Sequence, residues 1–160
     1  MKKSIYFLFL ISLFIGCSSY QPPKDYKVEK ETTLSKSYDV VWQNVVDYFA
    51  THNTPIKTMD KGTGLIATDY NLTVTEALKY MDCGEAGNTL GAHQRIEGQS
   101  GNFNILLKKL DENTTKVTAN VFFNSILTTY GDKGEILKSE KINCNSKGVL
   151  EKELISNISR

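Results

Sequence analysis

One amphipathic segment limits the folds that are open to this chain. Between residues 37 and 52 the large apolar side chains recur at every third or fourth residue, which is the spacing of one face of an α-helix. The apolar positions are Tyr38, Val41, Trp42, Val45 and Phe49. Polar residues lie between them, so this helix has one stripe to bury and needs another apolar surface to cover it.

The rest of the chain supplies that surface mainly as β-strands. Apolar or β-branched residues are frequent in six segments that are separated by turn-forming residues. We expect strands at residues 28–34, 55–60, 65–70, 102–110, 116–127 and 135–143. Turns with two glycines at 61–64 and 131–134 close hairpins, so the strands that they join are antiparallel.

Two further helices are expected. A short helix covers residues 73–81, and a second amphipathic helix begins near residue 147, capped by Asn145 or Ser146. The apolar stripe of this last helix consists of Leu150, Leu154 and Ile158. Because both amphipathic helices need cover, we expect an α+β fold: an antiparallel sheet with the two amphipathic helices packed on one face.

Residues 84–101 show a different composition. They contain five of the eleven glycines of the chain and no apolar period, so we expect a long mobile loop. Mobile loops on a rigid scaffold often carry binding residues. Gly84, Gly87 and Gly91 are therefore candidate contacts for a partner.

The composition sets the size of the domain and excludes one class of partner. Of 160 residues, 40% are hydrophobic and 23% are charged, as in ordinary globular proteins. Without the N-terminal leader described next, one domain remains, which we assign to residues 27–160. The formal net charge is +1 and the sequence has no lysine- or arginine-rich cluster, so we expect no nucleic-acid partner.

Residues 1–16 are typical of a bacterial lipoprotein signal peptide. Two lysines precede the apolar run Ile5–Ile15, which is too short to span a bilayer, a task that takes about 20 residues, but suits the apolar region of a signal peptide. The run ends in the sequence LFIGC, which resembles the bacterial lipobox, with Gly16 before the lipid-acceptor Cys17. The resemblance implies cleavage before Cys17 and its acylation. A plain secretory signal with an incidental cysteine is the alternative.

The residues after Cys17 indicate where the anchor lies. Ser18 stands where an aspartate would retain a lipoprotein in the inner membrane, so the sorting rule of Gram-negative lipoproteins implies the outer membrane. We expect residues 17–26, which are polar and contain two prolines, to form an extended tether. The membrane is then a partner through the lipid. The periplasmic face is favoured, and the cell surface is the alternative.

Cys83 and Cys144 are the other two cysteines. In an oxidising compartment two cysteines most simply pair, so we expect a disulfide. Unpaired thiols and a catalytic cysteine are the alternatives, but the sequence has no CxxC and no recognisable cysteine-protease motif around His52 or His93. The two cysteines and the two histidines also lack the sequence spacing of zinc ligands, so we expect no metal site.

The first helix and the hairpin that follows it carry a family resemblance. Trp42 on the helix precedes an apolar strand, the turn Asp60–Gly64 and a second apolar strand. This pattern, over Tyr38–Tyr70, resembles the helix-grip domains of BamC-like lipoproteins, accessory subunits of the outer-membrane β-barrel assembly machine. The resemblance implies that fold and a non-catalytic role. The chain departs from the larger family members in having one domain and a short tether, and the cysteine pair is not part of the pattern.

Side chains with an exposed aromatic or titratable group are the other candidates for a site. Phe122 and Phe123 must point to opposite faces of their strand, so one is expected in the core and the other is a candidate partner contact. Trp42, at an apolar helix position, is expected in the core.

An acid–base pair is conceivable among four residues in or beside the glycine-rich segment, which are Asp82, Glu85, His93 and Glu97. A solvated loop is the preferred interpretation because nothing in the sequence fixes their geometry. A hydrolase that uses Glu85, His93 or Cys83 is accordingly the least favoured function.

These features together predict a lipid-anchored, non-catalytic lipoprotein that binds other proteins of the cell envelope, and the resemblance implies a role in outer-membrane protein assembly. The alternative of a different class is a carrier of a small apolar ligand or lipid in a cavity between helix and sheet. That cavity would be lined by Trp42, Val45, Leu65 and Phe122. No cofactor is expected.

Overall fold

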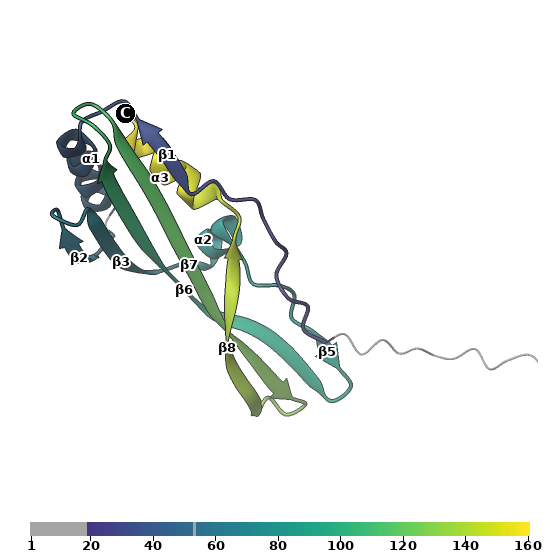
Figure 1. Ribbon diagram of the computed structural model, residues 1–160. Coiled ribbons are helices and arrows are strands. Elements are labelled where there is room, and N and C mark those ends of the chain that lie inside the picture. The colour runs from purple at the N-terminus through teal and green to yellow at the C-terminus, as the bar shows by residue number, and fades with distance from the viewer. Residues whose placement is uncertain (1–18, 53) are drawn as a thin grey trace, which may run out of the picture.

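A computed structural model describes residues 19–52 and 54–160, so the predicted signal peptide and Cys17 lie outside the described residues. The chain folds as an α+β protein, with a mostly antiparallel sheet and three helices (Figure 1). Its elements are β1 (Glu31–Leu34), α1 (Tyr38–Thr51), β2 (Ile56–Asp60), β3 (Leu65–Asn71), α2 (Val74–Tyr80), β4 (Met81–Asp82), β5 (Asn88–Thr89), β6 (Ala92–Lys109), β7 (Thr115–Gly131), β8 (Ile136–Ser146) and α3 (Val149–Ile158). Within the described ranges, no helix has the length and hydropathy of a membrane span.

Strand β7 is the organising strand of the sheet. The strands follow the order β2-β3-β6-β7-β8-β4, while β1 pairs with β7 and β5 pairs with β6, all antiparallel. Because β6 occupies one edge of β7 along its length, β1 and β8 share the other edge. β1 pairs with it up to Thr118 and β8 pairs with it from Phe123 onward, which leaves a short stretch of β7 between the two.

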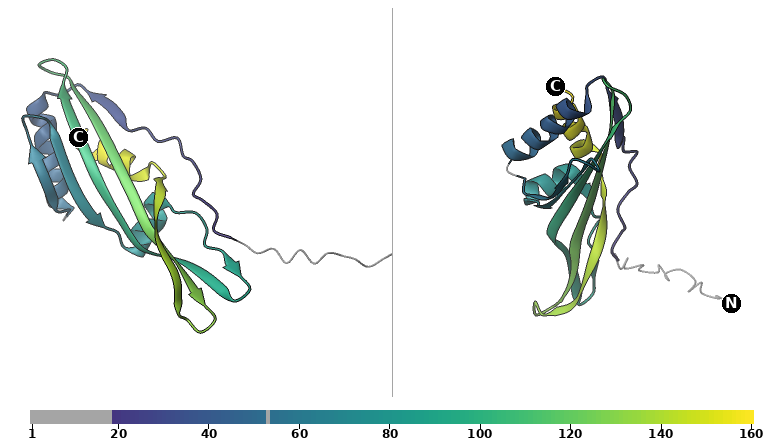
Figure 2. Two further views of the ribbon diagram at one scale, coloured as in Figure 1. Left: turned by 60° about the horizontal axis from the view of Figure 1, so that its bottom comes forward. Right: turned by 60° about the vertical axis from the view of Figure 1, so that its left-hand side comes forward.

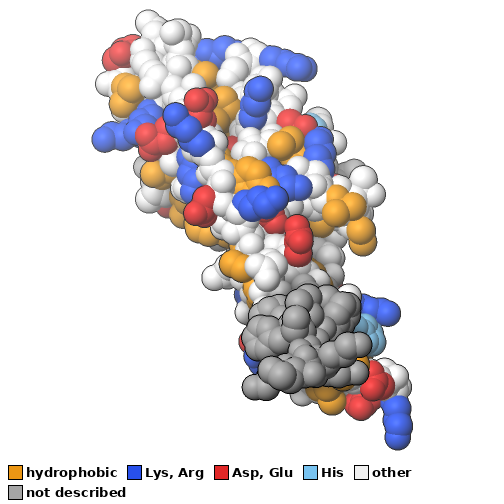
Figure 3. Space-filling model, turned by 90° about the vertical axis from the view of Figure 1, so that its right-hand side faces the viewer, with side chains coloured by type: hydrophobic (Ala, Val, Ile, Leu, Met, Phe, Trp, Pro, Cys, Tyr) orange, Lys and Arg blue, Asp and Glu red, His pale blue; other side chains and the backbone are white. Residues whose placement is uncertain are grey.

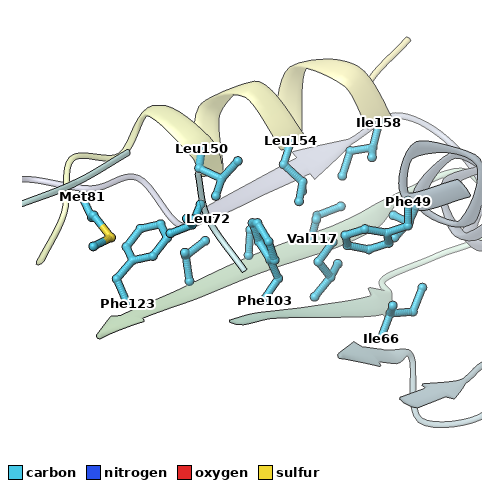
Figure 4. Close-up of a cluster of buried hydrophobic side chains, with 14 of the residues drawn as sticks. Phe49, Ile66, Leu72, Met81, Phe103, Val117, Phe123, Leu150, Leu154 and Ile158 are labelled. Atoms are coloured by element: carbon cyan, nitrogen blue, oxygen red, sulfur yellow. The ribbon is translucent and has the colours of Figure 1, made fainter. Parts of the chain in front are cut away.

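The core lies between the sheet and the helices. The predicted stripe of α1 is confirmed, because Val41, Trp42, Val45 and Phe49 are all buried. Figure 4 shows the apolar stripe of α3 facing buried side chains of β6 and β7. Alternate residues of β6 and β7 point into this core, as the period of a strand requires. The four buried residues of the α1 stripe are therefore covered.

Helix α3 begins later than its sequence suggests. Its N-cap is Gly148 in the left-handed region, not Asn145 or Ser146. Ser146 contributes differently: its Oγ accepts a hydrogen bond from the Gly148 N–H and donates one to the buried carboxylate of Glu151. A serine two residues before the cap thus organises the first turn.

The prediction of a mobile loop at 84–101 is wrong. Residues from Ala92 onward form the first half of β6, and β5 pairs with its start. The glycines have structural roles that composition alone does not distinguish from a loop. Gly98 lies in the stretch where the β6–β7 register shifts, and a Cβ on Gly101 would lie 2.8 Å from a ring carbon of Phe123.

Strands β6, β7 and β8 extend well beyond the helices (Figure 2). We call this projecting part, residues 92–100, 124–131 and 136–143, the arm. It ends in two turns, one between β5 and β6 and the other between β7 and β8. The helices pack at one end of the molecule, and the arm forms the other.

Candidate functional site

Residues 19–26, the described part of the expected extended tether 17–26, are docked on the domain. Gln21 and Glu85 form an antiparallel bridge in which each backbone N–H donates to the other carbonyl, with both N–O distances 3.0 Å. The Tyr20 hydroxyl donates to the carbonyl of Cys83 at 2.8 Å. We call residues 19–26 the docked segment.

Asp82 is the main anchor of this docked segment. Its Oδ2 accepts hydrogen bonds from the Lys24 N–H at 3.1 Å and from the Tyr26 hydroxyl at 2.9 Å. Its Oδ1 accepts from the Gly84 N–H at 2.8 Å. Burial raises the pKa of Asp82, but these three hydrogen bonds and the nearby Lys147 charge outweigh it, so the pKa lies below its ordinary value. The hydrogen bond to Asp82 in turn raises the pKa of Tyr26.

The expected disulfide between Cys83 and Cys144 is confirmed. It joins the stretch that carries the docked segment to strand β8. Next to it, Asn145 Nδ2 donates to the carbonyl of Lys24 at 2.8 Å and to a carboxylate oxygen of Asp25 at 3.2 Å. Strand β8 therefore holds the docked segment both through the disulfide and through a direct contact.

A groove of about 630 Å³ lies between residues 25–30 and strands β6, β7 and β8. It sits over the stretch of β7 that has neither β1 nor β8 as a neighbour. Phe122 lines it with half of its surface exposed, 51%, whereas Phe123 is buried in the core with 4% exposed. The two phenylalanines thus point to opposite faces, and the exposed one lies in the groove.

Asparagines surround Phe122 on this face of the sheet. They are Asn102 and Asn104 of β6, Asn120 and Asn124 of β7, and Asn143 and Asn145 of β8. Asn102 lies directly opposite Phe122 in the β6–β7 pairing, and the other β6 and β7 asparagines face one another or β8. Strands disfavour asparagine, so six on one face are not there for the stability of the sheet. We call this surface the amide face.

Most of the amide face has free hydrogen-bonding capacity. Ser100 Oγ donates to Asn124 Oδ1 at 2.8 Å, and Asn145 holds the docked segment. Among the described residues, no hydrogen bond engages the side-chain amides of the other four asparagines. Each amide offers two N–H donors and a carbonyl acceptor. The face therefore presents uncharged donors and acceptors around one apolar ring.

The three glycines expected to contact a partner do not gather at one place. Gly84 has a φ of +81°, and a Cβ there would lie 2.0 Å from the carbonyl oxygen of Gln21, so its role is to admit the docked segment. Gly87 is buried and exchanges hydrogen bonds with Gln94 of β6. Gly91 is exposed in the turn at the end of the arm.

The candidate acid–base residues are engaged in other contacts. His93 stacks on Tyr130 with ring centroids 5.4 Å apart, and the Tyr130 hydroxyl donates to Glu97 at 2.9 Å. Asp82 holds the docked segment, and Glu85 forms the backbone bridge to Gln21 with an exposed side chain. In the part of the chain that the structure describes, no group of three or more histidine, cysteine or acidic residues could hold a metal ion.

The four residues proposed to line a ligand cavity are divided between two faces. Trp42 and Val45 are buried in the core. Phe122 lies on the opposite face of the sheet, and Leu65 pairs with the exposed Leu106 on that face. The four side chains therefore do not enclose a common space.

The docked segment and the amide face are the parts of this site that sequence reasoning missed. The asparagines at alternating strand positions were a readable signal for the amide face, whereas nothing in residues 19–26 indicates what they contact. Comparison of the sequence with protein-family models and with curated proteins finds no match. The functional argument therefore rests on the geometry of the site.

Proposed function

We propose that this chain is a lipid-anchored, non-catalytic binding module of the bacterial cell envelope, and that a protein partner docks in the groove at Phe122. The exposed Phe122 ring carries the proposal. A large aromatic side chain that is accessible in a groove, inside a rim of polar groups, has the composition of a protein–protein contact with its central anchor. The LFIGC sequence supports the lipid anchor.

The proposal includes the finer arrangement of a helix-grip domain of the BamC-like type. In this arrangement α1 and α3 cover one face of the sheet and the groove lies on the other. Contacts of α1 with β6, of α3 with β7 and of the two helices with each other support it. So does the separation of Phe122 from Phe123, because the buried ring belongs to the helix side. The partner we propose is accordingly an outer-membrane protein of the β-barrel assembly machinery.

A non-catalytic role is supported by how the titratable side chains are used. His93 and Glu97 both contact Tyr130, and Asp82 accepts three hydrogen bonds that position the chain itself. The asparagine side chains of the amide face are uncharged, and amides are poor acids, bases and nucleophiles. They are suited to pairing with the backbone or side-chain amides of another chain.

Crosslinking in intact cells tests the proposal. The lipidated protein is crosslinked in its membrane, and the attached proteins are identified for the unchanged chain and for two variants. Phe122→Ala removes the groove ring and is expected to lose the crosslinked assembly protein. Leu106→Ala is the matched control, since Leu106 is similarly exposed, 44%, on the same face but outside the groove.

Two outcomes would count against this function. If no envelope protein is recovered with the unchanged chain, or if both variants lose it equally, the groove is not the docking site. Lipid bound to the purified protein in native mass spectrometry, with no protein partner, would favour a carrier of a small apolar ligand instead.

A further inference from the structure

The end of the arm exposes an apolar cluster. Leu90, in the β5–β6 turn, is 97% exposed, and Ile136 and Leu137, at the start of β8, are 64% and 57% exposed. The two turns lie side by side, since Ala92 pairs with Gly131 at their base. We call Leu90, Ile136 and Leu137 the arm tip. Figure 3 shows hydrophobic side chains exposed at this lower end of the molecule, among acidic and basic ones.

The chain before the docked segment starts near the same end. The Gln21–Glu85 bridge is antiparallel, so the chain from Gln21 back to Ser19 points the way that the chain runs from Glu85 toward Leu90. In Figure 1 the described chain accordingly begins beside β5. Cys17 precedes Ser19 by two residues, and two residues span at most about 7 Å in any conformation. A lipid on Cys17 would therefore lie on the arm side of the molecule.

We propose that the arm tip inserts into the surface of the bilayer that holds Cys17. This inference rests on the lipid anchor of the proposed function. The anchor confines the arm tip to the neighbourhood of the membrane, so the three side chains face a high effective concentration of lipid. Burying apolar side chains in the interface is favourable in proportion to their exposed area, and here nearly all of Leu90 is available.

The charges around the arm tip indicate what kind of contact this is. Asp132 and Glu135 are acidic, Lys133 and Lys138 are basic, and all four are exposed. With the two signs balanced, attraction to anionic lipids contributes little. The contact is apolar, so it does not need anionic lipid and persists at high salt.

A tryptophan reporter tests this contact in the full lipidated protein. The chain has one tryptophan, Trp42, which is 7% exposed in the core. Leu90→Trp places a second one at the arm tip. Met59→Trp is the matched control, because Met59 is 54% exposed in β2, at the end of the molecule opposite the arm. Both variants are reconstituted in phosphatidylcholine vesicles whose acyl chains carry bromine, a contact quencher of tryptophan.

The emission that Leu90→Trp adds to that of the buried Trp42 is expected to shift to shorter wavelength and to be mostly quenched, while the emission added by Met59→Trp is unchanged. The same loss is expected at low and at high salt. A protein that floats with the vesicles but shows equal, weak quenching in both variants overturns the insertion and leaves the lipid anchor standing. Quenching that high salt abolishes also overturns it, in favour of a headgroup contact. Failure to float overturns the anchor, and the insertion with it.

Discussion

At the scale of single residues, a few polar and glycine positions decide where the N-terminal part of the chain lies. Asp82 belongs to a two-residue strand and has no signature in the sequence. It nevertheless accepts hydrogen bonds from two residues of the docked segment and from Gly84. Gly84 provides the close approach to Gln21. Asp82 and Gly84 are therefore two of the positions that hold the docked segment, together with the Gln21–Glu85 bridge and Asn145.

The pH dependence of docking follows from Asp82. Its pKa is lower in the folded protein than in the free residue, where it is about 3.9. The carboxylate therefore contributes stability that is fully present above about pH 3.9 and is lost as the pH falls through the lowered value. We expect hydrogen exchange at the Lys24 amide to lose protection in that acidic range. In Asp82→Asn the protection should be weak already at neutral pH, and an unchanged Lys24 amide there would contradict the role given to Asp82.

Gly84→Ala tests the close approach, with Gly134→Ala as its control. Both glycines have a φ of +81°, so both substitutions cost the strain of a left-handed alanine, about 1–2 kcal/mol. Only at Gly84 would the new Cβ also meet a backbone oxygen, whereas Gly134 has nothing within 4 Å. We expect Gly84→Ala to release the docked segment to limited proteolysis and Gly134→Ala to leave it protected. Equal cleavage of both variants would show that strain, not contact, matters there.

At the scale of elements, the disulfide and the strand alternation connect the two halves of the molecule. Cys83 follows β4 and Cys144 lies in β8, so the bond holds the stretch that carries the docked segment against the strand that enters the arm. The groove, the docked segment and the arm all meet near this bond. We therefore expect removal of the disulfide to affect the groove, the docked segment and the arm.

Replacing both cysteines by serine measures that connection. A disulfide that closes a loop of this length contributes about 2–4 kcal/mol to the free energy of unfolding. We expect urea unfolding of the double variant to show a loss of that size, with faster hydrogen exchange in residues 19–26. If the free energy of unfolding falls but residues 19–26 keep their protection from hydrogen exchange, the hydrogen bonds of the docked segment hold it in place without the disulfide.

The elements that the sequence could predict are those governed by local periodicity. The stripe of α1, the hairpin at 61–64 and the end-of-chain stripe all follow from spacing within one segment, and all three are confirmed. The first half of β6 could not be predicted in this way. Its glycines serve a register shift and the approach of Phe123, which are properties of a neighbouring strand.

At the scale of the whole molecule, core, groove and arm tip occupy different regions of one elongated sheet. Sequence reasoning reached the α+β class and the disulfide, because both depend on few and strong constraints. The site could not be predicted from the sequence, because the groove forms where β1, β8 and the docked segment come together from distant parts of the chain. Strand alternation predicted that one of Phe122 and Phe123 would be exposed, whereas the fold was needed to show that it is Phe122 and what surrounds it.

In the lipid-anchored form proposed above, the docked segment also determines how the domain meets a partner. A free tether of ten residues would let the domain range about 35 Å from a lipid on Cys17, whereas a chain held from Tyr20 onward leaves about 10 Å. The domain would then stay close to its own bilayer, and a partner embedded in the same membrane would be found by lateral diffusion in two dimensions.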